Sequence, residues 1–170
     1  MTDITFIVLL FVHVGTVILW MGASILYVSV LGPSIGKLAP TSRADLMKTI
    51  GSAYERYIVS NATIAIVAGL ILYGYMTQVA KTLPNNSPEV PWLAAGIIFG
   101  LIAYIIGIVV VMRSNRKLMR MMSQTPTPSP DSGAPSAEMK MVQRRLAIGA
   151  GLQALFLFLA LLSMVVGANL

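Results

Sequence analysis

Charge, cysteine and histidine are all scarce in this chain of 170 residues. Only 11% of the residues are charged and 56% are apolar, whereas a soluble domain carries about a quarter charged residues. So few charges cannot cover a surface that faces water, and the long apolar runs therefore indicate that lipid is the solvent. The absence of cysteine excludes disulfides, thiolate metal sites and cysteine nucleophiles.

Familiar catalytic motifs are also missing. The sequence has no phosphate-binding glycine loop, no H-E-x-x-H pair and no nucleophile elbow. Its longest apolar runs contain no acid of the kind that an ion-coupled transporter needs. The sequence leaves enzymatic activity open and favours a protein that is not an enzyme. The net charge of +6 does not indicate nucleic-acid binding, because the basic residues cluster beside apolar segments.

Four apolar segments are long enough to cross the hydrocarbon core of a bilayer, which takes about 20 helical residues. They cover approximately residues 4–31, 57–79, 92–112 and 146–168. This pattern predicts a single all-α domain over residues 1–170, an integral membrane up-and-down four-helix bundle. The stretch at about 123–137 is rich in proline and polar residues and is predicted to be a disordered loop.

The basic residues predict how the chain lies in the membrane. Of the twelve lysines and arginines, all but Lys81 fall in the connections 32–56 and 113–145 or at their edges. The positive-inside rule places these two connections in the cytoplasm, so the N-terminus and the C-terminus are both expected outside. We therefore expect a multi-pass protein of the cell membrane, with the lipid bilayer as its surroundings and no nucleic-acid partner.

Polar and aromatic residues recur along one face of the first span. His13, Thr16, Trp20, Ser24 and Tyr27 follow one another at steps of three or four residues, so they share a helix face that is expected to point into the bundle. His13 is the only histidine. Its imidazole can ligate a haem iron or a copper ion or relay protons, or it can be a neutral group bonded to a neighbouring helix.

Polar and small residues in the other spans favour helix packing. Asn61, Tyr104 and Gln153 are interpreted as groups that hydrogen-bond between helices, each bond contributing roughly 0.6–2 kcal/mol. Small residues recur at spacings that let helices approach closely: Gly96, Gly100, Ala103 and Gly107 in the third span, and Ala147, Gly151 and Ala154 in the fourth.

Two signals predict helix boundaries near the first basic connection. Pro33 is expected to end the first helix, because proline lacks the amide hydrogen that a helix interior needs. Ser42 opens the run S-R-A-D, a variant of the capping box. A short amphipathic helix is therefore expected to begin there, either lying on the inner membrane face or serving only as a connector to the second span.

The run H-V-G-T-V-I-L-W-M-G at residues 13–22 has the spacing H-x6-W-x-G. It resembles the opening helix of the CopD-like membrane proteins, the copper resistance D superfamily. Pro33, Arg56 and the run Ala68-Gly69-Leu70 fit the same pattern. The resemblance implies that the protein binds haem b or copper, with His13 as the ligand and Trp20 packing beside it. A homodimer would supply a second His13.

The same H-x6-W spacing also resembles the haem-binding membrane protoporphyrinogen oxidases of the HemJ type. Those enzymes carry a lysine in a later span, and this chain has none there, which counts against that activity. Three functions stay open: a CopD-like protein that binds haem b or copper at His13, a structural or accessory subunit of a larger membrane complex without a cofactor, and a membrane oxidoreductase acting on porphyrin.

Overall fold

The computed structural model describes residues 3–84, 86–124 and 137–169, and all regular structure within these ranges is helical. Four helical runs are long and apolar enough to cross a membrane: Ile4–Gly36, Thr41–Val79, Glu89–Met121 and Ala137–Gly167. The prediction of an all-helical chain with four such helices is confirmed. Most of the loop predicted at 123–137 lies outside the described residues.

Each run except the last contains a short π-helical segment. The first run consists of α1 (Ile4–Leu26), η1 (Tyr27–Leu31) and α2 (Gly32–Gly36). The second consists of α3 (Pro40–Gly74) and η2 (Tyr75–Val79), and the third of α4 (Glu89–Ile106), η3 (Gly107–Met112) and α5 (Arg113–Gln124). The fourth is the single helix α6 (Ala137–Gly167).

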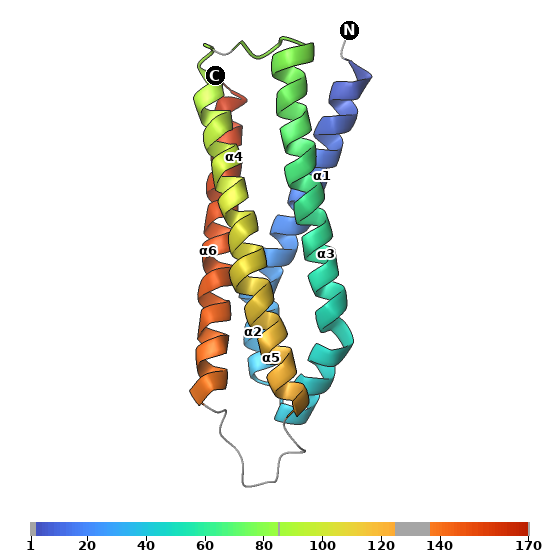
Figure 1. Cartoon of the computed structure of the whole chain (residues 1–170), viewed down its shortest axis with the longest axis vertical. Coiled ribbons are helices and arrows are strands. Elements are labelled where there is room, and N and C mark those ends of the chain that lie inside the picture. Colours follow the sequence, from blue (N-terminus) through green and yellow to red (C-terminus); the bar gives the residue numbers. More distant parts are fainter. Residues whose placement is uncertain (1–2, 85, 125–136, 170) are drawn as a thin grey trace.

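Successive runs point in opposite directions, so α1 begins and α6 ends at the same end of the bundle (Figure 1). The opposite end holds α2, the beginning of α3, α5 and the beginning of α6 (Figure 1). Every lysine and arginine except Lys81 belongs to the helices and connections in the half of the bundle nearer this opposite end. We call it the basic end.

The four runs form two helix pairs. α1 packs along α3, and α4 packs along α6, whereas the two pairs touch each other over a smaller area (Figure 1). Where they meet, Trp20 is only 2% exposed and packs in a core of small and branched residues, namely Ala62, Ala65, Ala103 and Leu157. The indole ring therefore fills the space that the alanines leave between the pairs.

Asp3 caps α1 and also joins it to the second run, at the end opposite the basic end. Asp3 is the N-cap of α1, and its carboxylate accepts a bond from the backbone N–H of Thr5. The Tyr75 hydroxyl in η2 donates a second bond to the same carboxylate. Both bonds favour the charged form and lower the pKa of Asp3.

Close packing within the second pair uses glycines of both helices. Gly96 and Gly100 of α4 are buried, as expected of a close-packing face. In α6, however, the small residues buried in the turn around position 151 are Gly149 and Ala150, and Gly151 is exposed with no neighbour near the position of a Cβ. The contact expected at Gly151 is therefore wrong, because α6 turns Gly149 toward Val110 instead.

Pro33 does not end the first helix, contrary to expectation. The turn before it is π-helical, and the Gly32 N–H donates to the Tyr27 carbonyl five residues earlier. A π turn is wider than an α turn, so it admits the proline ring without the usual clash against the preceding turn. The helix continues through α2 and ends at Gly36.

Ser42 likewise does not begin a helix. α3 begins at Pro40, a residue suited to the first turn, and runs without a break to Gly74. The expected short amphipathic helix is thus the first part of one 35-residue helix. Arg43 in this part donates to the carbonyl oxygens of Ile35 and Gly36 at 3.1 and 2.6 Å, which satisfies the end of α2.

Candidate functional site

His13 lies in the half of α1 away from the basic end and faces α3. Its Nδ1 is 2.8 Å from the carbonyl oxygen of Ala65. A carbonyl oxygen can only accept a hydrogen bond, so Nδ1 carries the proton in this contact. In the neutral ring, Nε2 then keeps its lone pair. The absence of a side chain at Gly69 leaves room for the imidazole ring, since a Cβ at that position would lie only 2.6 Å from His13 Cε1.

The bond to Ala65 leaves the other ring nitrogen of His13 with its lone pair. A carbonyl that accepts from Nδ1 is the usual way to orient an imidazole whose Nε2 ligates a metal. No group of three or more His, Cys, Asp or Glu side chains that could hold a metal ion occurs among the described residues. Nε2 of His13 could thus supply a single nitrogen ligand to a haem iron or a copper ion.

Trp20 lies about two turns further along α1 than His13, toward the basic end. Seven residues separate the two, which corresponds to about 10 Å along a helix. Trp20 lies in the core between the helix pairs, and its ring meets the ring of Tyr104 edge to face, with centroids 6.4 Å apart. The Tyr104 hydroxyl in turn lies 3.0 Å from the Thr63 hydroxyl, a bond that joins α4 to α3.

Three other polar residues of the predicted set bond within their own helices. Thr16 donates to the carbonyl of Val12 at 2.7 Å, and the buried Ser24 donates to that of Trp20 at 2.9 Å. Asn61 donates to the Tyr57 carbonyl of α3 at 2.8 Å, and not to another helix as expected. Short polar side chains satisfy themselves in this way in apolar surroundings.

Tyr27 and Tyr54 form a stacked pair that the sequence analysis did not foresee. Their ring centroids are 5.4 Å apart, and the Tyr54 hydroxyl donates to the Ala23 carbonyl at 2.6 Å. This bond joins α3 to α1. Tyr54 was not predicted as an interior residue because it falls in the predicted connection 32–56. Its spacing of four residues from Ile58 could have indicated that the two share a helix face.

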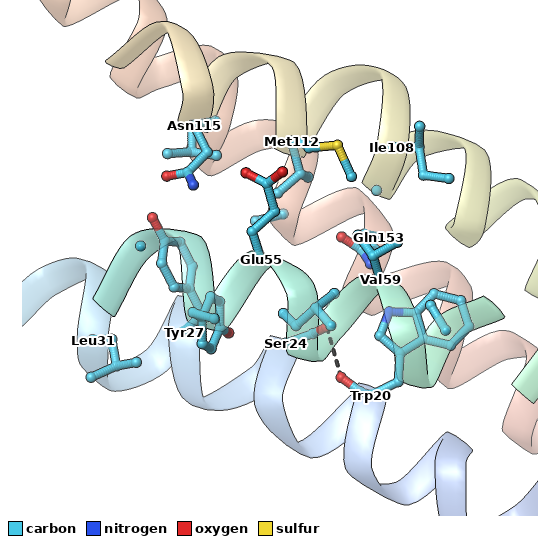
Figure 2. A pocket seen from close by; sticks show the side chains of 18 of the residues that line it. Trp20, Ser24, Tyr27, Leu31, Glu55, Val59, Ile108, Met112, Asn115 and Gln153 are labelled. Carbon is cyan, nitrogen blue, oxygen red and sulfur yellow. Dashed lines mark hydrogen bonds between the residues drawn. The ribbon is translucent and has the colours of Figure 1, made fainter. Parts of the chain in front are cut away.

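A cavity opens between the two helix pairs, in the half of the bundle nearer the basic end (Figure 2). The cavity volume is about 70 Å³, and about 880 Å³ of space free of protein atoms surrounds it when its wide opening to the outside is counted. Residues from all four runs line it, within the segments 20–35, 47–62, 104–115 and 146–153. The π-helical η1 and η3 both border it, and His13 does not. π turns of this kind often occur at functional sites.

Two polar groups at one end of the cavity lack hydrogen-bond partners. Trp20 Nε1 is buried and has none in the described part of the chain. The Gln153 side chain is 4% exposed and also makes no hydrogen bond with a described residue. Figure 2 shows both side chains at the same end of the cavity. Leaving the buried Trp20 donor unsatisfied costs about 1–3 kcal/mol.

The cavity lining contains one charged side chain, Glu55, and an arginine neutralises it. Glu55 Oε1 accepts bonds from Arg116 Nε at 2.7 Å and Nη2 at 2.6 Å. The neighbouring Asn115 also lines the cavity, and its Oδ1 is buried without a partner among the described residues. Glu55 lies just before the predicted second span, so its sequence position did not predict that it would line a cavity.

No protein-family model, curated protein or solved structure matches this chain. The resemblances of the first span are therefore neither supported nor opposed by a relative. Functional inference rests on two features of the molecule: the oriented imidazole of His13 and the cavity with its unpartnered groups.

Proposed function

We propose that this chain is a small multi-pass protein of the cell membrane that binds a neutral lipophilic molecule between its two helix pairs. The observation that carries the proposal is the buried Trp20 Nε1, which has no partner in the described part of the chain and borders the cavity. Since buried polar groups are nearly always hydrogen-bonded, an orphaned donor in a cavity favours a ligand that completes it.

The position of the cavity supports the same proposal. The positive-inside rule places the basic end in the cytoplasm and both termini outside, so the cavity occupies the cytoplasmic half of the membrane. Its lining is mostly apolar, from Trp20 down to Leu31 and Ile35 on the first run. A molecule dissolved in the inner leaflet would exchange lipid contacts for protein contacts there and gain the hydrogen bond that lipid tails cannot supply.

Photochemical labelling in lipid nanodiscs tests this proposal. A neutral long-chain aliphatic diazirine is expected to attach to cavity-lining residues, with labelling that saturates and that an excess of unlabelled lipophile prevents. Val59→Phe fills the cavity from α3 and should abolish the saturable labelling. Val67→Phe is the matched control, because Val67 is 50% exposed on the same helix and does not line the cavity. Equal labelling of both variants and the wild type would rule the proposal out.

Haem b held by His13 is a second candidate, favoured by the bond from Nδ1 to Ala65. A bound haem would supply one-electron chemistry, and His13 would hold it through Nε2. A second copy of the chain would have to supply any second histidine, since His13 is the only histidine in the sequence. The expected result is a Soret band in the purified protein that His13→Ala removes. A colourless protein would contradict haem binding and would favour either the cavity ligand alone or an accessory subunit of a larger complex.

A further inference from the structure

We infer that the molecule bound in the cavity is uncharged and carries a carbonyl oxygen, which accepts hydrogen bonds from Trp20 Nε1 and Gln153 Nε2. This inference rests on the proposed function and specifies its ligand. Trp20 and Gln153 come from different helix pairs, α1 and α6, so one ligand oxygen between them would bridge the two pairs.

The donors define the acceptor. The indole N–H of Trp20 can only donate, so it needs an acceptor and gains nothing from a second donor. The Gln153 amide stands where Gly107 leaves room for it, since a Cβ there would lie 2.9 Å from Gln153 Nε2. A carbonyl oxygen has two lone pairs and can therefore accept from both groups at once.

The electrostatics of the lining define the charge. Glu55 is the one charged residue of the lining, and Arg116 already holds it with two bonds. A ligand with a net charge would find no free opposite charge there, and an uncompensated charge in apolar surroundings is strongly unfavourable. A neutral ligand meets no such penalty. Quinone rings and the ester groups of lipids are two sources of a neutral carbonyl on a lipophilic body.

Competition binding in lipid nanodiscs tests the inference. Tritiated decylubiquinone is the reporter, and the competitors are dioctanoylglycerol, which carries ester carbonyls, and dodecylbenzene, which has no acceptor. Saturable quinone binding is expected to weaken about 3- to 10-fold in Trp20→Phe and again in Gln153→Leu, the effect of losing one hydrogen bond. Dodecylbenzene should displace the quinone only weakly, with a strength that neither substitution alters.

Matched controls separate the hydrogen bonds from general effects on the protein. Trp92→Phe and Gln78→Leu change the same residue types at exposed positions away from the cavity, and quinone binding should be unchanged. Unchanged competition by dodecylbenzene in the Trp20 and Gln153 variants shows that the cavity is still folded. If dioctanoylglycerol displaces the quinone with the same dependence on Trp20, an ester lipid can supply the carbonyl. If dioctanoylglycerol does not displace the quinone, the carbonyl comes from a quinone ring.

Two results would overturn the inference in distinguishable ways. If quinone and dodecylbenzene compete equally and neither substitution changes the quinone affinity, the cavity binds lipophiles without recognising a carbonyl, and only the proposed function stands. If no probe binds saturably to the wild type, the proposed function fails as well.

Discussion

Replacing Gly69 by alanine is expected to destabilise the protein by about 2–4 kcal/mol, because it combines overpacking with the loss of a half-buried hydrogen bond. The added Cβ would lie 2.6 Å from His13 Cε1 and 2.8 Å from Nδ1. The imidazole would have to move away, which breaks its bond to the Ala65 carbonyl and loosens α1 from α3. The free energy of unfolding, measured by titration with a denaturing detergent in mild detergent micelles, checks the prediction.

A double-mutant cycle shows whether His13 causes the effect. In a His13→Ala background the clash is absent, so Gly69→Ala should cost less than about 0.5 kcal/mol, the scale of an independent surface substitution. His13→Ala alone removes both the bond to Ala65 and the ring that fills the space beside Gly69. Additive effects of the two substitutions would contradict the geometry described for this contact.

Gly149→Ala is the second substitution with a large expected effect, a loss of about 1–3 kcal/mol from overpacking. The new Cβ would meet Val110 Cγ1 at 2.7 Å and Val110 Cβ at 3.3 Å. Valine has only a restricted choice of rotamers in a helix, so it cannot turn aside easily, and α6 would have to separate from η3. The same detergent titration measures the loss.

Gly151→Ala is the matched control for this substitution. Gly151 lies on the same helix two residues away, and a Cβ there would have no neighbour within 4 Å. Alanine is a better helix former than glycine by roughly 1 kcal/mol, so stability should stay equal or rise. If Gly151→Ala proved as damaging as Gly149→Ala, the rotational setting of α6 in this structure would be incorrect.

The membrane-length helices were predictable because their signal is local. A run such as 92–112 contains no charge and is long enough to span the hydrocarbon core, which identifies a candidate span without reference to any other part of the chain. The wrong boundaries also have local causes. Pro33 normally ends a helix, and nothing in the sequence announces the π turn over Tyr27–Leu31 that accommodates it.

The cavity was not predictable, because it depends on how the helices are rotated and paired. α6 carries small residues on several faces, so its sequence does not show that Gly149 packs while Gly151 stays exposed. Trp20 and Gln153 were identified individually as residues of the bundle interior, yet their shared position follows only from the approach of α1 to α6. Glu55 was assigned to a connection because the apolar part of the second span begins only at about residue 57. In the structure the helix α3 begins earlier, at Pro40.

The polar face of the first span was also predictable in part: the sequence indicated the shared face but not what each residue on it contacts. Its spacing placed His13 and Trp20 on one face of a helix. In the structure His13 bonds to the Ala65 carbonyl, and Trp20 packs in a core that includes Ala65 and also borders the cavity. The spacing alone did not show that Trp20 borders the cavity and His13 does not.

The mass of the intact protein and its bound molecule tests the central claim most directly. Native mass spectrometry of the chain released from nanodiscs should show one added neutral lipophile, retained in Val67→Phe and absent in Val59→Phe. A wild-type protein that carries no added mass in any membrane composition, or a Val59→Phe variant that keeps the same added mass, would contradict binding in the cavity.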